Sequence, residues 1–389
     1  MTPQAARAEF PLLSSCVYLN SNSTGAFPRG AREAATSYYD VVARWRDEAW
    51  EGFLTSMRAH ADDLAALIGA APGSITLDTS VSSLLGRLLS CFDYRERPRV
   101  VMSDLEFPCV ELIAGAFRRY GCAPVVVPSE DGISIPSQAI ADAIDERTQA
   151  VIVSHATFAT SALTDLAPIV RRARAMGALV VVDAYQSLGV VPFDVSTMDV
   201  DVVLGGSHKW LCGAIDSAFC YVRPALVRRL EPAATGWMAG RDPLSFARAD
   251  GLADDGRRMN GGTPAPLPSL TSREGLRIVS AVGVGTAREL SIARTTRIIE
   301  RADRAGITVA TPRAAAARGG VVNLKVQDGP ALVASLAAEG FVCSHRSGVR
   351  IAPHFYNTDE EIERFMDALI ARVERGGRVA AGHVAEARS

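Results

Sequence analysis

The fold of this chain is decided by residues 178–213, which read ALVVVDAYQSLGVVPFDVSTMDVDVVLGGSHKWLCG. The two apolar runs, Ala178–Val182 and Val200–Leu204, have the length and β-branched content of buried parallel strands. Polar residues follow each run, namely Asp183 and Gln186 after the first, and Ser207, His208 and Lys209 after the second. Ligands of open α/β sheets bind beyond the carboxyl ends of the strands. We therefore expect an acid and a lysine to meet in one crevice.

Lys209 is one of only two lysines among 41 basic residues. An ammonium group can lose its proton and attack a carbonyl carbon, which a guanidinium group in practice cannot do. The other lysine, Lys325, lies in VVNLKVQD, where an exposed strand position explains it. Burial and a neighbouring cation would lower the pKa of Lys209. These residues alone leave two interpretations open: a Schiff-base lysine, or a surface lysine that follows a strand by chance.

Asp183 favours the first interpretation. Pyridoxal phosphate enzymes need a lysine and a carboxylate that keeps the pyridine nitrogen protonated. The motifs VVVDAYQ and GGSHKWLCG resemble the cofactor core of the class V (fold type I) pyridoxal phosphate enzymes, which include kynureninases, cysteine desulfurases, selenocysteine lyases and isopenicillin N epimerases. The resemblance extends from Tyr18 to about Ala371. It implies that Lys209 forms the Schiff base, that Asp183 contacts the ring nitrogen and that Gln186 lies near the ring hydroxyl.

The same resemblance adds Ser207 and His208 to the cofactor-binding loop, with His208 also among the catalytic residues. It implies an α/β chain with a large domain, whose mostly parallel, seven-stranded-type sheet is flanked by helices, and a small α+β C-terminal domain. The expected divisions are an N-terminal segment over the active site (1–28), the large cofactor-binding domain (29–268), a connecting helix (269–305), the small domain (306–376) and a flexible tail (377–389).

Several elements are expected from hydrophobic periodicity and from turn residues. Helices are expected at Arg29–Trp45, Leu54–Ile68 and, in one long stretch, Ser269–Ala305. The strand Ser217–Val222 is expected to run antiparallel to its neighbours, and 341–344 is expected to form one strand.

Composition and charge exclude several classes of protein. The 389 residues carry a net charge of −2, so there is no electrostatic reason to expect nucleic acid or an acidic membrane surface as a partner. No apolar run reaches the roughly 18 residues of a membrane-spanning helix, and the N-terminus lacks the pattern of a signal peptide. We therefore expect a cytoplasmic protein. The seven cysteines and six histidines lack metal-site spacings, so no metal is expected.

A hydroxyl-rich turn precedes the expected helix in LDTSVSSLLGRLLSCF. Hydroxyl groups and free backbone N–H groups at a helix N-terminus bind anions, although a plain N-cap would explain one such hydroxyl. Kynureninases carry a similar turn for the cofactor phosphate, which implies this role for Thr79 and Ser80. The kynureninase pattern Phe-Pro also recurs at Phe107, which implies a ring that stacks on the pyridine. The alternative for Phe107 is a core residue at a helix start.

The resemblance assigns further contacts. Thr157 stands where relatives carry an asparagine that touches the ring hydroxyl. Because the residue type differs, the sequence leaves open whether Thr157 makes the same contact with the cofactor. Trp237 and Thr263 correspond to residues that reach the cofactor phosphate of a neighbouring subunit, which implies a homodimer with a shared active site. Arg350, in R-I-A-P-H-F-Y-N-T, corresponds to the arginine that holds the substrate α-carboxylate, and a bidentate guanidinium suits that group. Its alternative is an edge-strand cation.

The segment SCVYLNSNSTG resembles the opening segment that lies over the active site of class V enzymes. The resemblance implies that Asn22 and Ser23 approach the substrate. The alternative is that the segment is a simple surface loop. We expect an amino-acid substrate and a β-lyase that cleaves C–S or C–C bonds at Cβ, such as a cysteine-conjugate lyase or a kynureninase-like enzyme. An aminotransferase or epimerase is the alternative. A desulfurase is disfavoured because Cys343 lies in an expected strand, and a regulatory module because no DNA-binding segment accompanies the domain.

Overall fold

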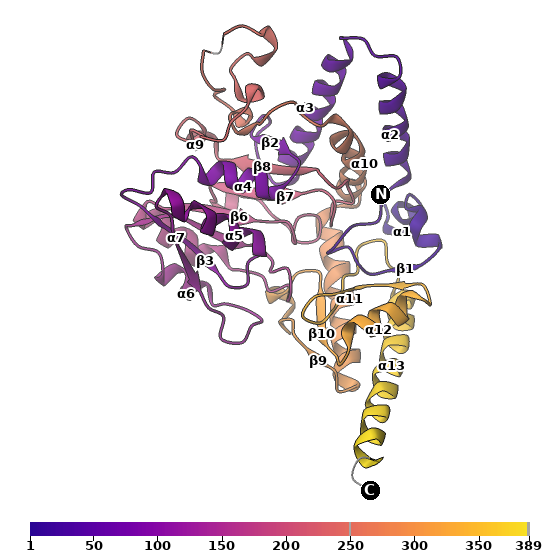
Figure 1. Cartoon of the computed structure of the whole chain (residues 1–389). Coiled ribbons are helices and arrows are strands. Elements are labelled where there is room, and N and C mark those ends of the chain that lie inside the picture. The colour runs from indigo at the N-terminus through magenta and orange to yellow at the C-terminus, as the bar shows by residue number, and fades with distance from the viewer. Residues whose placement is uncertain (249, 387–389) are drawn as a thin grey trace.

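A seven-stranded sheet forms the centre of the computed structural model, which describes residues 1–248 and 250–386 (Figure 1). Its order is β2-β8-β7-β6-β5-β3-β4. The strands are β2 (Ile75–Asp78), β3 (Arg99–Ser103), β4 (Ala123–Val127), β5 (Thr148–Ser154), β6 (Leu179–Asp183), β7 (Val202–Gly206) and β8 (Ala218–Val222). β8 pairs antiparallel with β2 and β7, and every other pair is parallel. The expected mostly parallel sheet and its antiparallel strand are confirmed.

The two faces of this sheet form two separate hydrophobic clusters, because successive side chains of a strand point to opposite faces. On β6, Val180 and Val182 belong to one cluster and Val181 to the other. One face is covered by α3 (Ala49–Leu67), α6 (Ser137–Asp142), α7 (Leu166–Met176) and α10 (Pro266–Val282), and the other by α4 (Val81–Leu89) and α5 (Pro108–Ala116). The result is an α/β/α sandwich whose parallel strands all end at one edge.

A smaller sheet follows in the C-terminal part of the chain, with the order β12-β13-β10-β9. Its strands are β9 (Thr308–Val309), β10 (Val322–Lys325), β12 (Ser344–His345) and β13 (Val349–Ile351). β9, β10 and β13 share a hydrophobic cluster with α11 (Val284–Arg304), α12 (Gly329–Ala337) and α13 (Asp359–Glu386). In Figure 1, this part lies below the large sheet, in orange and yellow.

The N-terminal segment reaches this C-terminal part. It contains α1 (Pro3–Arg7), the 3-10 turn Pro11–Ser14 and β1 (Val17–Tyr18), and it precedes α2 (Arg29–Val42). β1 pairs in parallel with β11 (Phe341–Val342) in a separate two-stranded sheet, so the start of the chain is joined to the C-terminal part before it enters the helices of the large domain. The remaining short elements are α8 (Val195–Met198), α9 (Pro224–Val227) and the 3-10 turns Phe117–Tyr120, Trp237–Ala239, Pro243–Ser245, Gly256–Met259 and Ala315–Ala317.

Four expected elements differ in the structure. The helix expected at 269–305 is broken at Gly283, whose φ of 89° lies in the left-handed region, so α10 and α11 are separate helices. The strand expected at 341–344 is interrupted at Cys343 into β11 and β12, which belong to different sheets. α2 ends at Val42, three residues before the expected Trp45, and α3 begins at Ala49, before the expected Leu54.

The C-terminal boundary also differs from the expectation. α13 continues through Glu386 and so includes most of the segment expected as a flexible tail, while 387–389 lie outside the described residues. Thr358 caps this helix, because its Oγ1 accepts the Glu361 N–H at 3.2 Å. In the described part of the chain, no helix has both the length and the apolar character that would let it cross a membrane.

Candidate active site

Lys209 lies in a cavity of about 410 Å³ at the carboxyl edge of the large sheet, three residues after the end of β7. Burial lowers the pKa of its amine to about 8, although the negative charge of Asp183 acts in the opposite direction. The positive charge of Arg350 contributes to this lowering of the pKa. About one tenth of the amine is therefore neutral and nucleophilic at pH 7, against less than about one thousandth for an ordinary surface lysine. The interpretation as a chance surface lysine is thus disfavoured.

Two aromatic rings hold the Lys209 amine. Its Nζ lies 4.3 Å from the ring centroid of Tyr185 and 5.7 Å from that of Phe107. The Tyr185 ring lies against Gly206, where a Cβ atom would come within 2.1 Å of the phenol, so only glycine fits there. Tyr185 Oη is hydrogen bonded to His208 Nδ1 at 2.9 Å. Sequence reasoning missed Tyr185, although its place two residues after Asp183 was a signal.

Asp183 ends β6 and lines the same cavity, as the parallel strand pattern predicts. The Tyr185 N–H donates to its Oδ1 at 2.9 Å. Burial raises the pKa of this carboxyl, and the Tyr185 hydrogen bond and the charge of Lys209 partly oppose that change. A cation placed beside Asp183 would therefore gain a strong, poorly screened partner.

The N-terminus of α4 supplies hydroxyl groups to the same cavity, where Thr79, Ser80 and Ser82 line it. Ser80 is the N-cap and accepts the Ser83 N–H at 3.1 Å. Thr79 Oγ1 donates to Asp78 at 3.2 Å. The plain-cap interpretation thus accounts for Ser80 alone, and the helix N-terminus is available for an anion.

Phe107 is 44% exposed and lines the cavity just before α5, so the interpretation as a core residue is wrong. Its ring packs edge-on against Phe158, with centroids 5.3 Å apart. Stacking of this ring on a pyridine stays a prediction.

Arg350 comes from the small sheet and reaches the same cavity. Its strand β13 lies between β12 and β10, so the interpretation as an edge-strand cation is wrong. Nη1 donates to the Phe158 carbonyl at 3.0 Å and Nη2 to Ser344 Oγ at 3.2 Å, whereas the buried Nε has no partner in the described structure. Burial and the nearby charge of Arg346 lower the pKa of Arg350 to about 10. A carboxylate bound in the cavity would give the unpaired Nε a partner and would stabilise the buried positive charge of Arg350.

The N-terminal segment closes the cavity, where Asn22 and Ser23 line it, and is not a simple surface loop. Asn22 is 1% exposed, and neither polar atom of its side-chain amide has a partner within the described residues. Such a buried, unpaired amide is expected to bind a ligand group. The Gly25 N–H donates to the His208 carbonyl at 2.7 Å, and a Cβ at Gly25 would come within 2.1 Å of the Lys209 carbonyl. Gln186 Nε2 donates to the Asn22 carbonyl at 3.0 Å.

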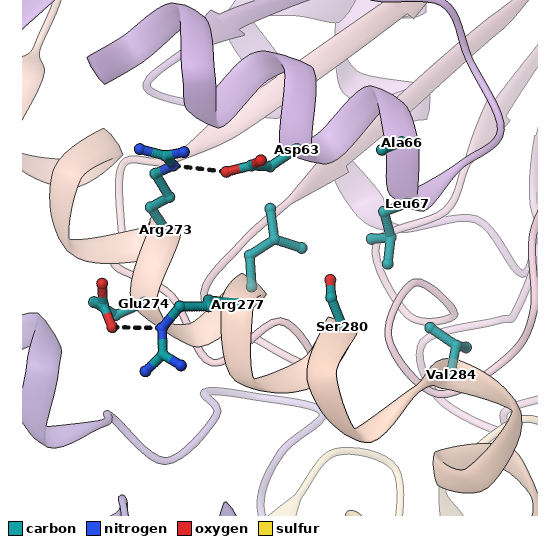
Figure 2. Close-up of a pocket in the computed structure, with 9 residues that line it drawn as sticks. Asp63, Ala66, Leu67, Arg273, Glu274, Arg277, Ser280 and Val284 are labelled. Carbon is teal, nitrogen blue, oxygen red and sulfur yellow. Dashed lines mark hydrogen bonds and ion pairs between the residues drawn. The ribbon is translucent and has the colours of Figure 1, made fainter. Parts of the chain in front are cut away.

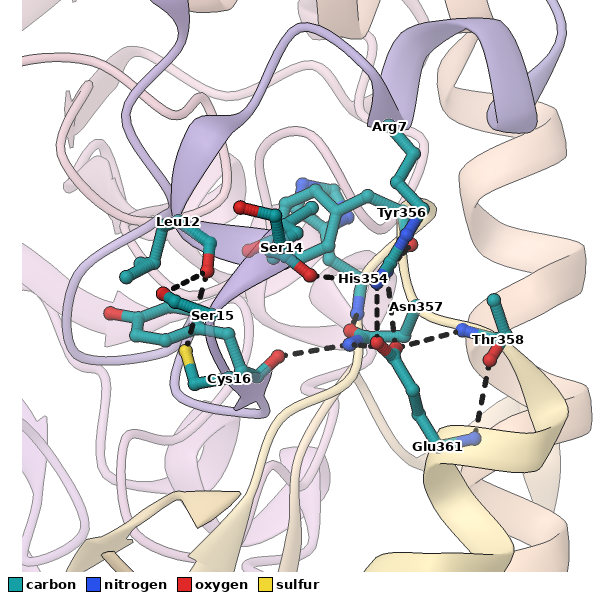
Figure 3. A network of polar contacts seen from close by, with 12 residues as sticks. Arg7, Leu12, Ser14, Ser15, Cys16, His354, Tyr356, Asn357, Thr358 and Glu361 are labelled. Atoms are coloured by element: carbon teal, nitrogen blue, oxygen red, sulfur yellow. Dashed lines mark hydrogen bonds and ion pairs between the residues drawn. The ribbon is translucent and has the colours of Figure 1, made fainter. Parts of the chain in front are cut away.

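The segment is fixed to the C-terminal part by a buried polar network (Figure 3). Arg7 donates two hydrogen bonds to the Glu361 carboxylate, of 2.6 and 3.2 Å, and one of 2.6 Å to the Tyr356 carbonyl. Asn357 Nδ2 donates to Glu361 and to the Tyr18 carbonyl, both at 3.0 Å. The position of Asn22 therefore depends on α13.

We expect Arg7→Ala to lower the free energy of unfolding by about 1.5–3 kcal/mol, because hydrogen bonds to charged groups have that value and the Glu361 carboxylate is largely buried. Urea unfolding followed by circular dichroism measures the change. Arg95→Ala is the control, since Arg95 pairs with Asp93 on the surface and such pairs contribute little. Equal losses in the two variants would contradict the structural role of the network.

Comparison with known proteins agrees with this geometry. Residues 17–365 match the family described as Aminotransferase class-V. The chain belongs to the class V aminotransferase family. It is 30% identical to an uncharacterized aminotransferase of Bacillus subtilis, YcbU, over 95% of this chain and 98% of that protein. It is 28% identical to the isopenicillin N epimerase of Streptomyces clavuligerus (95% and 98% covered) and to a kynureninase of Burkholderia pseudomallei (87% and 84% covered).

Solved structures share the fold of this class V enzyme. A cysteine desulfurase from Thermococcus onnurineus superimposes with a TM-score of 0.85 at 20% identity, covering 96% of this chain and 98% of the other. The cystine C–S lyase C-DES, in complex with cysteine persulfide, gives 0.85 at 21% identity, covering 93% and 99%. These similarities confirm fold type I.

Class V enzymes depend on pyridoxal phosphate, which confirms the expected cofactor. The described residues fit it: an amine of lowered pKa, a buried carboxylate and a helix N-terminus lined with hydroxyls surround one cavity. Lys209 would hold the aldehyde carbon, Asp183 the ring nitrogen and α4 the phosphate.

Four predicted contacts of this class V enzyme lie outside the cavity lining. Ser207 Oγ accepts from Ser217 Oγ at 3.1 Å, and Thr157 Oγ1 is hydrogen bonded to Thr160 Oγ1 at 2.7 Å, so both hydroxyls have partners elsewhere. Trp237 Nε1 donates to Thr263 Oγ1 at 3.4 Å, away from the cavity of their own subunit. The contacts predicted for these four residues, and the dimer, stay predictions.

A second cavity, of about 660 Å³, lies between α3 and α10 and shares no lining residue with the first (Figure 2). Its arginines are already paired, Arg273 with Asp63 at 2.6 Å and Arg277 with Glu274 at 3.1 Å. No lysine lines it. The cavity of Lys209 is therefore the candidate active site.

The lowered pKa of Lys209 predicts its reactivity in the cofactor-free protein. We expect labelling by a small amine-reactive reagent to be half-maximal in rate near pH 8, because only the neutral amine reacts. Peptide mass spectrometry resolves Lys209 from Lys325. In Asp183→Asn the midpoint should fall, because the carboxylate that favours the ammonium is gone. A midpoint near 10.5, the value of an ordinary lysine, would contradict the buried environment.

Proposed function

We propose that this class V enzyme is a pyridoxal phosphate-dependent β-lyase that cleaves a C–S or C–C bond at Cβ of an α-amino acid. The observation that carries the proposal is Lys209, whose amine has a pKa of about 8 and lies over Tyr185. Such an amine can accept the α-proton and then, as an ammonium, return a proton to a leaving group. The Phe107–Pro108 pair, which follows the kynureninase pattern, supports a lyase.

The cysteines support the same choice over a desulfurase. Cys343 is 7% exposed, and burial raises the pKa of its thiol to about 12. Cys109 lines the cavity but lies on α5, and burial raises its pKa as well. Sulfur transfer to a cysteine needs a thiolate on a mobile segment, and neither residue offers both.

In this mechanism, the chain's own residues bind and orient the substrate. When bound, pyridoxal phosphate supplies a carbonyl for the substrate amine and a ring that accepts electrons. Arg350 binds the α-carboxylate, and Asn22 contributes its free amide. Asp183 would keep the ring nitrogen protonated, and Phe107 would help to hold the ring. Lys209 would remove the α-proton and hold it as an ammonium beside the Tyr185 ring.

The alternative is an aminotransferase, which the 30% identity to YcbU supports, or an epimerase, which the isopenicillin N epimerase relative supports. The test incubates the holoenzyme with cystine, S-alkylcysteines or kynurenine without any 2-oxo acid. Continuous release of a persulfide from cystine, of a thiol from S-alkylcysteines or of the acyl product from kynurenine supports the lyase. A single turnover that a 2-oxo acid restarts, or exchange of the α-proton with inversion and no cleavage, overturns it.

We expect Arg350→Ala to raise KM for the amino-acid substrate roughly 10- to 150-fold with little change in kcat, because a charge-assisted pair contributes about 1.5–3 kcal/mol. Steady-state kinetics measures both constants. Arg350→Lys should recover only part of the loss, since an ammonium cannot bind a carboxylate bidentately. Arg313→Ala, an exposed arginine paired with Asp303, is the control. An unchanged KM in Arg350→Ala would remove this residue from the site.

A further inference from the structure

Glu106 is a buried acid in the loop between β3 and α5, directly before Phe107. It is 8% exposed, and its recorded partners in the described structure are neutral serine groups, with no ion pair. A buried carboxylate without a cation is costly and is expected only where it has a function. The sequence offered no signal for it, since an acid at a helix start is common.

The Glu106 carboxylate bridges the ends of two strands. Its Oε1 accepts from Ser103 Oγ at 2.6 Å, and its Oε2 accepts from the Ser154 N–H and Oγ at 2.7 and 2.5 Å. Ser103 is the last residue of β3 and Ser154 the last of β5, which is the next strand in the sheet. Three donors from two strands fix both oxygens, so the carboxylate has a single defined position.

This position is next to Asp183. In the parallel pairing of β5 and β6, Ser154 lies opposite Asp183, so one serine separates the two acids. The charge of Asp183 and, more strongly, burial raise the pKa of Glu106 to about 7, against the three hydrogen bonds that stabilise its anion. The edge of the sheet therefore carries two adjacent buried carboxyl groups. The sequence pattern predicts only one of them, Asp183.

We propose that Glu106 is a positioning residue of the cofactor site, whose negative charge strengthens the hold of Asp183 on the proton of the pyridine nitrogen. When Glu106 is ionised, its charge adds to the negative potential of Asp183 at the ring nitrogen, so removal of the proton from that nitrogen is less favourable. The hydrogen-bonded bridge keeps this charge at a fixed distance. The inference rests on the role proposed for Asp183 and not on the lyase reaction.

The test uses the holoenzyme reconstituted with pyridoxal phosphate that carries ¹⁵N in the ring, and it follows the ¹⁵N chemical shift against pH. We expect Glu106→Gln to lose the ring proton at a pH lower by roughly one unit than the wild type. The amide keeps the shape of the side chain and removes its charge. Glu111→Gln, on the exposed side of α5, is the matched control and should titrate as the wild type does.

A second variant covers the case in which Glu106→Gln does not fold. Ser103→Ala removes one donor from the Glu106 anion and should shift the midpoint in the same direction by a smaller amount. A wild-type midpoint in a folded Glu106→Gln, or in Ser103→Ala if Glu106→Gln does not fold, overturns the proposal. No turnover is measured, so these outcomes are independent of whether the enzyme is a lyase. Failure of the wild type to bind the cofactor through Lys209 would instead overturn the site itself.

Discussion

Replacing Lys209 with alanine is expected to reduce turnover at least ~10³-fold, because a positioned acid–base group contributes 10²- to 10⁴-fold and this one also holds the cofactor covalently. The visible absorbance of the protein-bound imine should disappear, while phosphate and ring contacts retain some cofactor without a covalent bond. Absorption spectroscopy and activity assays on purified protein measure the two effects.

The chain provides its own control for this experiment. Lys325 is the other lysine, and its amine donates to the Ser347 carbonyl on the small sheet, away from the cavity lining. Lys325→Ala should therefore keep both the absorbance and the activity. Normal turnover in Lys209→Ala would contradict the assignment of the site as a whole.

Asp183→Asn is expected to lower kcat about 30- to 5000-fold. Removing one partner of a buried, hydrogen-bonded charge pair costs about 2–5 kcal/mol, and the ring needs its nitrogen proton to accept electrons. The amide is close in shape to the carboxylate, so the Tyr185 N–H keeps an acceptor. The loss should thus appear in kcat more than in KM or in the unfolding temperature.

Asp165→Asn is the control for this substitution. Asp165 caps α7 by accepting the Ala167 N–H at 3.0 Å, and asparagine is as good a cap as aspartate, so stability and kinetics should not change. Asp183→Asn with the kinetics of the wild type would show that the ring nitrogen does not need this carboxylate.

Local sequence predicted the parts of the site that follow strands. Asp183 comes directly after an apolar run of β length and Lys209 a few residues after another, and parallel strands bring their carboxyl ends together. Arg350 could be predicted only through a motif. Its strand, β13, belongs to another sheet, and hydrophobic periodicity does not show that a residue of that sheet lines the cavity of Lys209.

The residues that were missed depend on contacts between segments far apart in sequence. Tyr185 was read as part of a motif, but its orientation depends on Gly206, which leaves room for the ring. The position of the Glu106 carboxylate depends on its hydrogen bond with Ser154, a residue 48 positions away at the end of β5. The break at Gly283 was missed because the hydrophobic pattern continues across it, and only the backbone conformation separates α10 from α11.

The link between Arg7 and Glu361 has a consequence for how the enzyme is made. These residues are separated by 354 positions, and β1 likewise can pair only after β11 has been synthesised. During synthesis, the large sheet can form while the segment that carries Asn22 still lacks its anchor. Closing so long a loop is slow, so the substrate pocket is completed only after the ribosome has delivered the start of α13. A nascent chain that has not reached Glu361 is therefore expected to present the Lys209 crevice open on one side.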